Sequence, residues 1–447
     1  MTGAWWVPAA APAPPAPALR IVVDPGTFDC LNLGDVAMLQ IAVRRLRLLW
    51  PDARMQIFTS DAAALLRHCP GVEPLADGGR RTWLSRQNLL GSLHARMPRP
   101  LSVLLGDGRT ALRHRSPRLL RGLLRLRLRG HAVARADLER FFEAMSGADL
   151  LVLSGAAAFT DSGRAHTFAV LDTVDLALAG GAVLALVGQG VGPINDASLL
   201  ARMRRTLPGA VLATVREGRM GRRLLGAAGV DDGCIAETGD DAVELAHERR
   251  PAGLGSALGV NVRVAGYAGV GDAVVDSLRP MVEAFVTERG IEIVALPIAR
   301  HSRVSDPASI RRLVSGWRHA EIAGLDADAP GAVIAEAGRC RVVLTGAYHA
   351  AVFALSQGVP ALGVVGSDYY AEKFAGLADE FGGGCRVVRV DQSGWCERAA
   401  AELAQLWADA DALRPDLLGA AGRQIERGRR AYQRLPAAMA GAAGRPR

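Results

Sequence analysis

The sequence predicts an α/β protein of two halves, each built on a parallel sheet, with a cleft between the halves. Short apolar runs alternate with helical patterns along most of the chain. The alternation stops at a glycine- and proline-containing break, His247–Ser256, and then starts again. The 447 residues, half of them hydrophobic, suffice for two domains. Repeated strand–helix units favour parallel strands, and ligands of such sheets bind beyond the carboxyl ends of the strands.

The first half is predicted to span residues 19–247. Its expected strands are Leu19–Val23, Met55–Thr59, Leu150–Leu153, Ala182–Val187, Val211–Thr214 and Ile235–Glu237. Residues 35–49 carry an apolar stripe at helical spacing and are predicted to form the first helix. Residues 1–18 are rich in alanine and proline and lack the layout of a signal peptide, so we expect a disordered leader.

The second half is predicted to span residues 256–410. Its expected strands are Leu258–Asn261, Ile291–Pro297, Val342–Leu344, Ala361–Val365 and Cys385–Val388. Residues 411–447 are predicted to form a C-terminal helix and a tail.

A basic insertion at about residues 78–135 interrupts the α/β pattern. Arg118, Arg121, Arg125 and Arg129 recur there at helical spacing and leucines occupy the remaining positions, which predicts a basic amphipathic helix near 118–129. One interpretation is peripheral contact with an anionic membrane. The other is a solvated helix whose leucine face packs on the domain. The sequence contains no run of ~18 uncharged apolar residues, so we expect no membrane-spanning helix.

Composition narrows the class of partner and the compartment. The net charge of +8 suits anionic partners, which include phosphorylated substrates, anionic membranes and nucleic acid. Aromatic residues make up only 5% of the chain and do not alternate with the arginines, which argues against nucleic acid. The six cysteines form no C-x-x-C pair and show no metal-ligand spacing. We therefore expect a cytoplasmic protein without a metal site.

Polar residues with a possible chemical role follow several of the predicted strands. Asn32, Gly34 and Asp35 precede the first helix, where backbone N–H groups can face an anion; Asp35 could also simply cap the helix. Asp161 follows a loop of small residues and is either a cleft carboxylate or another cap. Arg216 follows the strand Val211–Thr214 and either faces the cleft or pairs structurally.

Two further candidates belong to the second half. His349 follows the strand Val342–Leu344 at the start of a helix, and histidine is the commonest acid or base near neutral pH. Lys373 is the single lysine of a chain in which arginine supplies every other basic charge except histidine's. Because lysine is a compact charge with a tunable pKa, Lys373 either has a specific role or is a chance survivor of a composition bias. It lies after the strand Ala361–Val365, at the same sheet edge as His349.

In order and spacing, these elements resemble the polysaccharide pyruvyl transferase family from about residue 20 to residue 381. The resembling motifs are N-L-G-D at Asn32–Asp35, G-Q-G-V-G-P at Gly188–Pro193, V-R-E at Val215–Glu217, T-G-D at Thr238–Asp240, G-V-N-V-R at Gly259–Arg263, and the stretch Thr345–Leu377. The resemblance implies two Rossmann-like domains arranged as in B-type glycosyltransferases. It also implies phosphoenolpyruvate as the donor, a sugar or lipid-linked glycan as the acceptor, and a cyclic pyruvate ketal as the product, with no further cofactor.

The resemblance also implies roles for individual residues. His349 would bind the donor and act as acid and base, Arg216 and Lys373 would hold the anionic groups, and Asp161 would orient or deprotonate the acceptor. Arg263, Asn32, Gly34 and Asp35 would complete the donor site.

The chain departs from the family pattern at two places. Ala347 stands where members usually carry an arginine, two residues before the histidine, and Ser154-Gly155-Ala156 replaces a glycine triplet. Arg263 or Arg300 could supply the missing donor-binding cation.

Two other functions stay open at this point. The chain could be a B-type glycosyltransferase that uses a nucleotide sugar, or a non-catalytic descendant that binds a glycan or a protein partner. The joint presence of His349, Arg216 and Lys373 favours an enzyme. We expect it in the cytoplasm, with the inner face of the membrane as a peripheral location.

Overall fold

The first half of the chain forms a seven-stranded, all-parallel sheet. The computed structural model describes residues 18–85, 99–155, 158–302, 304–317 and 322–443. In spatial order the strands are β3 (Glu73–Ala76), β2 (Arg54–Thr59), β1 (Arg20–Asp24), β4 (Leu150–Ser154), β5 (Val183–Gln189), β6 (Ala210–Val215) and β7 (Ile235–Glu237). The direction of winding reverses between β1 and β4, where Ile21 pairs with Met55 on one side and Leu150 on the other. Every residue of β4 is buried, as expected for a parallel strand covered on both faces.

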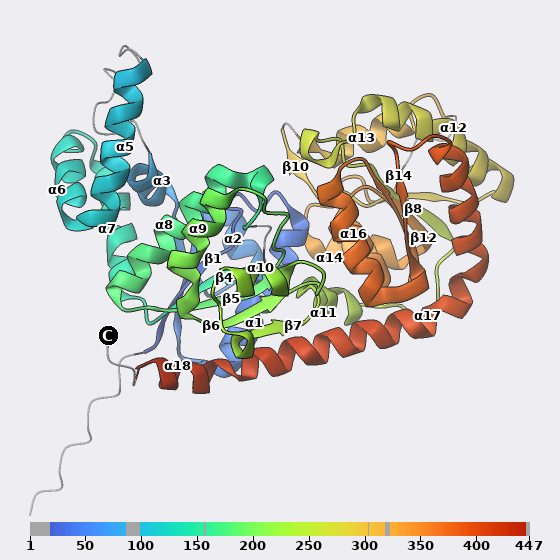
Figure 1. Cartoon of the computed structure of the whole chain (residues 1–447). Coiled ribbons are helices and arrows are strands. Elements are labelled where there is room, and N and C mark those ends of the chain that lie inside the picture. The colour runs from blue at the N-terminus through green and yellow to red at the C-terminus, as the bar shows by residue number, and fades with distance from the viewer. Residues whose placement is uncertain (1–17, 86–98, 156–157, 303, 318–321, 444–447) are drawn as a thin grey trace, which may run out of the picture.

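Helices join these strands and cover the sheet (Figure 1). They are α1 (Leu33–Leu49), α2 (Ala62–His68), α3 (Gly78–Leu84), α5 (Arg99–Arg115), α6 (Pro117–Arg127), α7 (Ala132–Gly147), α8 (Arg164–Gly180), α9 (Ala197–Thr206), α10 (Gly221–Ala227) and α11 (Ala242–His247).

The second half forms a five-stranded parallel sheet. Its strands, in spatial order, are β14 (Cys385–Arg389), β13 (Ala361–Val365), β12 (Cys340–Thr345), β8 (Ala257–Asn261) and β9 (Ile293–Ala295). Here the winding reverses between β8 and β12. Two-residue strands β10 (Arg300–His301) and β11 (Val304–Ser305) form a small antiparallel ladder beside it. The helices are α12 (Asp272–Arg289), α13 (Asp306–Leu313), α14 (Pro330–Gly338), α15 (Tyr348–Ser356), α16 (Asp368–Phe381), α17 (Trp395–Gln433) and α18 (Leu435–Ala443).

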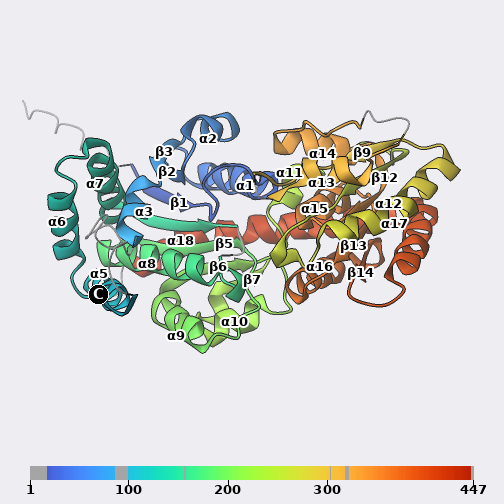
Figure 2. The same cartoon turned by 90° about the horizontal axis from the view of Figure 1, so that it is seen from above.

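Two helices join the halves. One side of α1, with Met38 and Ile41, packs into the hydrophobic core of the second half, and the other side, with Leu39 and Leu46, packs into the first. The long helix α17 runs back from the second half along the base of the molecule (Figures 1 and 2). Its end, with Tyr432, is buried against the first sheet. The C-terminal segment therefore completes the core of the N-terminal half.

The two parallel sheets confirm the predicted α/β fold class, and the predicted strands are present with small shifts of their ends. The sequence did not reveal β3 or the β10–β11 ladder. The predicted interdomain break at residues 247–256 lies between α11 and β8, and the C-terminal residues predicted as a helix from about 411 belong to the longer α17. The predicted leader lies outside the described residues apart from residue 18.

The basic insertion is helical where it is described. The predicted amphipathic helix is α6, whose Leu120 and Leu124 are buried against the first domain. Within the described residues, no helix has both the length and the hydrophobicity needed to cross a bilayer.

Candidate functional site

A cavity of about 390 Å³ opens between the two halves, at the point where each sheet reverses its winding. Loops after β1 and β4 form one wall, and loops after β8 and β12 form the opposite wall. This is the position at which open parallel sheets bind ligands. The lining residues are Gly26, Thr27, Asn32, Asp35, Thr160, Ser162, Gly163, His166, Arg216, Arg263, Tyr267, Ile298, Tyr348, His349, Tyr369, Tyr370 and Lys373.

Most residues that the sequence nominated meet in this cavity. Six of them line it directly: Asn32, Asp35, Arg216, Arg263, His349 and Lys373. They come from five separate stretches of the chain, two in the first half and three in the second, so only the fold brings them together. Gly34 lies directly behind them, against the ring of His349.

The N-terminus of α1 forms the floor beside His349. The Asn32 side chain caps the helix by accepting a hydrogen bond from the Gly34 amide at 3.1 Å. A Cβ on Gly34 would lie 2.0 Å from Cγ of His349, so glycine lets the imidazole pack on this helix. Asp35 accepts a hydrogen bond from the Thr27 hydroxyl at 3.2 Å. Burial raises the pKa of Asp35, although His349, Arg216 and Lys373 act in the opposite direction.

Arg216 and His349 share one buried carboxylate. The guanidinium of Arg216 donates to Asp240 Oδ2 at 3.2 Å and lies 5.2 Å from the centre of the Tyr348 ring. Burial would raise the pKa of Asp240, but His349 and Arg216 lower it to about 2. His349 Nε2 lies 3.5 Å from Asp240 Oδ2, and this buried nitrogen has no hydrogen-bond partner in the described structure. The Nε2 side of the ring therefore faces an anion at ion-pair distance, and the Nδ1 side packs against Gly34.

Arg263 is fixed by a second buried carboxylate. Its guanidinium donates to Asp306 through Nε at 2.7 Å and Nη2 at 2.9 Å, a bidentate pair. Asp306 also accepts bonds from the Asn261 side chain and two backbone amides. Most of the charge of Arg263 is thereby neutralised before a ligand arrives.

Lys373 differs from both arginines, because its ammonium faces rings and not carboxylates. Its Nζ lies 4.3, 5.6 and 5.8 Å from the ring centres of Tyr369, Tyr370 and Tyr348. No carboxylate within the described residues pairs with it. Burial, helped by repulsion from Arg216, lowers the pKa of Lys373 to about 7, against the attraction of Asp35. A ligand with negative charge would find its unpaired cation here.

The sequence did not single out several lining residues. His166 stands in the first turn of α8, and no motif marked it; burial lowers its pKa, although Asp24 and Asp35 oppose the effect. Tyr267 stacks on Tyr370 with the ring centres 6.0 Å apart. Tyr369 and Tyr370 had one signal, their place in the sequence next to Lys373, and Tyr267 had none.

Three other nominated residues do not line the cavity. The Asp161 carboxylate accepts hydrogen bonds from the backbone amides of Asn195 at 2.6 Å and Asp196 at 3.3 Å. Arg300 donates to the carbonyl of Ala327 at 2.8 Å. Ala347 is fully buried, and its amide donates to Thr345 Oγ1 at 2.9 Å. The acid/base assignment of Asp161 stays a prediction, which this placement does not favour.

Metal ligands are not clustered in the described part of the chain. No group of three or more histidine, cysteine, aspartate or glutamate residues there could hold a metal ion.

Solved structures of low sequence identity share the fold. One is a UDP-N-acetylglucosamine 2-epimerase from Listeria monocytogenes, with a TM-score of 0.57, 13% identity and coverage of 96% of this chain and 98% of that one. S. aureus MnaA, solved with UDP, has a TM-score of 0.52 at 10% identity and covers 96% and 99%. A glycosyltransferase from Rickettsia africae has a TM-score of 0.51 at 11% identity and covers 96% and 100%. The chain thus has the two-domain fold of B-type glycosyltransferases.

Sequence comparison identifies the family. No curated protein matches the chain at a significant level. The family model for polysaccharide pyruvyl transferase, however, matches residues 32–369. This range contains β4, β8 and β12 and every nominated residue that lines the cavity except Lys373, which lies four residues beyond its end. The chain belongs to the polysaccharide pyruvyl transferase family.

Proposed function

We propose that the protein transfers the pyruvyl group of phosphoenolpyruvate to two hydroxyls of a sugar, forming a cyclic ketal and releasing phosphate. The observation that carries this proposal is the unpaired ammonium of Lys373 in a cavity between the two domains that His349 and Arg216 also line. Membership of the family supports the same reaction class.

The donor carries a phosphate and a carboxylate, and the cavity offers several groups for them. Lys373 supplies a charge without a carboxylate partner in the described structure, and the Arg263 guanidinium, fixed by Asp306, adds further N–H donors. The helix α15 begins at the cavity, and Ala347 at its N-cap provides no side-chain acceptor for the first turn. The backbone N–H groups of this turn and the helix dipole suit an anion. In this chain they would act where other members use the arginine that Ala347 replaces.

The reaction needs two proton movements, and the cavity has groups for both. His349 gives a proton to the methylene carbon of the donor while the first sugar hydroxyl oxygen bonds to the neighbouring carbon. The second hydroxyl oxygen then bonds to that carbon as the carbon–oxygen bond to phosphate breaks. One hydroxyl proton passes to a base of the cavity while solvent returns a proton to His349, and the other leaves with the phosphate, so atoms and charge balance.

We assign the deprotonation of the acceptor to His166 or Asp35. Burial keeps the pKa of His166 below its ordinary value, so the ring is neutral near pH 7 and can accept a proton. Burial acts the other way on Asp35 and raises its pKa towards the range of a useful base. Thr160 and Ser162 stand on the same wall and offer hydroxyls to a sugar.

Binding of phosphoenolpyruvate, measured by isothermal titration calorimetry without an acceptor, tests the proposal. We expect saturable binding that Lys373→Met and Arg216→Ala weaken. Arg223→Ala, an exposed arginine outside the cavity, is the matched control and should bind as the wild type does. Absence of binding at millimolar ligand, or equal binding by all three variants, would overturn the assignment of the donor.

A nucleotide sugar is the second candidate donor. Four tyrosines line the cavity, Tyr267, Tyr348, Tyr369 and Tyr370, and aromatic rings can stack on a nucleobase. A panel of UDP-sugars in the same calorimeter separates the candidates. Tight binding of a UDP-sugar that Tyr267→Ala abolishes, without binding of phosphoenolpyruvate, would favour glycosyl transfer.

A further inference from the structure

Exposed apolar side chains concentrate in one small part of the molecule, the helices α5 and α6. The described chain exposes eleven large hydrophobic side chains, and seven of them lie between residues 101 and 133. These seven are Leu101, Leu104, Leu105, Leu119, Leu123, Leu126 and Val133. A scattered exposed leucine needs no explanation, but such a concentration marks an interaction surface.

The same segment has a strong excess of positive charge. Residues 99–135 contain ten arginines and one carboxylate residue, Asp107. Two of the arginines are internal: Arg109 donates to the carbonyl of Thr82, and Arg113 pairs with Asp172. Two more, Arg121 and Arg125, pair with Glu139. Exposed arginines without a carboxylate partner in the described structure include Arg115, Arg118, Arg127 and Arg129.

Charge and apolar surface are ordered on α6. Leu120 and Leu124 are fully buried and attach the helix to the domain. Leu119, Leu123 and Leu126 fall within an arc of ~60° on the outer side, given 3.6 residues per turn. They are exposed by 56%, 39% and 53%. Arg127 borders this arc on one side and Arg118 on the other. An apolar ridge between arginines is the arrangement of a helix that lies in a membrane interface.

A second cavity adjoins this face. It has a volume of about 600 Å³ and lies between the start of α6 and the helices α7 and α8. Arg115, Arg118 and Arg121 contribute to its wall, together with Leu119, Phe142 and Leu176. Cationic groups beside an apolar wall suit an amphiphile with an acidic head.

The placement leaves the surface accessible. Helices α5 and α6 project from the end of the N-terminal domain that is remote from the C-terminal domain, and both views agree on this (Figures 1 and 2). The face therefore does not belong to the cavity between the domains.

We propose that the α5–α6 face docks the protein on an anionic lipid bilayer, with its leucines entering the interface and its arginines contacting lipid phosphates. Charge complementarity selects this occupant. A second copy of the chain would bring arginines against arginines. Nucleic acid would use the charge but leave the leucines in water, and residues 99–135 contain no phenylalanine, tyrosine or tryptophan for stacking on a base. The proposal does not depend on which donor the enzyme uses.

Flotation of the full chain with vesicles tests the proposal. We expect the protein to float with vesicles that mix phosphatidylglycerol with phosphatidylcholine, to stay unbound with phosphatidylcholine alone, and to dissociate as salt is added. The double substitution Arg118→Glu with Arg127→Glu reverses two charges of this face and should weaken vesicle binding at least ~30-fold. The control is Arg205→Glu with Arg223→Glu, two exposed arginines away from this face. It changes the net charge by the same amount and should change vesicle binding less than ~3-fold.

The leucines need their own variant, because charge alone would also produce salt-sensitive binding. The triple change of Leu119, Leu123 and Leu126 to serine should weaken vesicle binding at least ~10-fold. Leu48→Ser with Leu66→Ser, exposed leucines outside the face, serves as its control. Urea unfolding should remain cooperative in all four variants, which shows that they fold. Failure of the wild type to float with anionic vesicles, or an equal loss in the control pairs, would overturn the proposal.

Discussion

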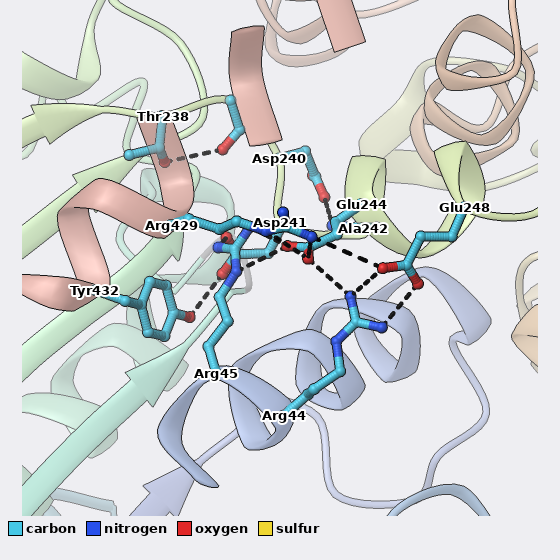
Figure 3. Close-up of polar contacts among 11 residues, drawn as sticks. Arg44, Arg45, Thr238, Asp240, Asp241, Ala242, Glu244, Glu248, Arg429 and Tyr432 are labelled. Atoms are coloured by element: carbon cyan, nitrogen blue, oxygen red, sulfur yellow. Dashed lines mark hydrogen bonds and ion pairs between the residues drawn. The ribbon is translucent and has the colours of Figure 1, made fainter. Parts of the chain in front are cut away.

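Two clusters of charged residues lie near each other, and they differ in whether their charges are paired. We call the first, formed by Arg45, Asp241, Glu244, Arg429 and Tyr432, the hinge cluster; the second lines the cavity. In the hinge cluster, Arg45 of α1 pairs with Asp241 at 2.6 Å and Glu244 at 2.6 Å, and Arg429 of α17 binds Glu244 at 2.6 Å (Figure 3). Tyr432 completes it with a 2.8 Å hydrogen bond to Asp241. In the cavity, by contrast, Lys373 contacts three tyrosine rings and pairs with no carboxylate among the described residues.

Consecutive residues connect the two clusters. Asp240 faces the cavity, where it contacts Arg216 and His349, and Asp241 faces the hinge. The turn before them depends on Gly239, which has a φ of +79° and whose Cβ would lie 2.1 Å from the Gln424 side chain. Paired buried charges therefore hold the helices α1, α11 and α17 together, whereas the ammonium of Lys373, which has no carboxylate partner in the described structure, is available to a ligand. The following changes test this division, from the largest expected effect to the smallest.

Removal of a partner from the hinge cluster should destabilise the protein most. Arg45→Ala leaves Asp241 and Glu244 buried without their main cation, which typically costs about 3–5 kcal/mol. We expect a clear drop in the free energy of unfolding in urea. Arg54→Ala is the matched control: its side chain is 47% exposed and its partner Glu73 is 44% exposed, so the loss should stay within about 1 kcal/mol. Equal losses in the two variants would refute the distinction.

A methyl group behind His349 should disturb the site by overpacking. Gly34→Ala places a Cβ 2.0 Å from the imidazole, so the ring or the helix must move. The expected cost is about 1–3 kcal/mol in the free energy of unfolding, with weaker donor binding. Gly122→Ala in α6, where an added Cβ meets nothing within 4 Å, should instead be neutral or slightly stabilising. A Gly34→Ala protein with wild-type stability and donor affinity would show that His349 is not held against α1.

Loss of the unpaired cation should affect binding but not folding. Lys373→Met keeps the length and the apolar stem and removes the charge, so phosphoenolpyruvate affinity should fall at least ~10-fold. Stability at pH 7 should be unchanged or higher, since a partly desolvated charge disappears. Calorimetry and urea unfolding on the same samples give both numbers. A loss of stability like that of Arg45→Ala would mean that Lys373 is structural.

The pH dependence of donor binding should be smaller but characteristic. The ammonium of Lys373, with its pKa lowered to about 7, loses its proton above neutral pH in the free protein. An anionic donor stabilises the charged form, so binding takes up a proton and affinity falls as pH rises above 7, by about three- to tenfold per pH unit. In the free protein the same group costs stability below pH 7, and that cost disappears as pH rises towards its ordinary value of 10.5.

Lys373→Arg provides the control for this slope. Its guanidinium stays charged over the whole range, so affinity should no longer decline between pH 7 and pH 9. Titrations in buffers of different ionisation enthalpy measure the proton uptake directly. A slope that persists in Lys373→Arg would assign the titration to another group.

The sequence predicted the two sheets because their buried strands are continuous apolar runs. It missed β3, which is an edge strand of four residues and contains Pro74, so neither its length nor its composition indicated a strand. It also predicted six cavity residues, because each follows a strand and the carboxyl ends of parallel strands meet at one edge. It did not predict His166, because the position of this residue depends on the path of the loop between β4 and α8. It also could not show that the backbone amides of residues 195 and 196 donate hydrogen bonds to the Asp161 carboxylate.

A crystal structure of the protein with phosphoenolpyruvate tests the central claim most directly. The account predicts the donor in the cavity between the domains, with one of its anionic groups within hydrogen-bond distance of Lys373 Nζ and its methylene carbon facing His349. The hinge cluster should keep its pairs. A donor bound elsewhere, or bound in the cavity with Lys373 still facing only its tyrosines, would contradict the account.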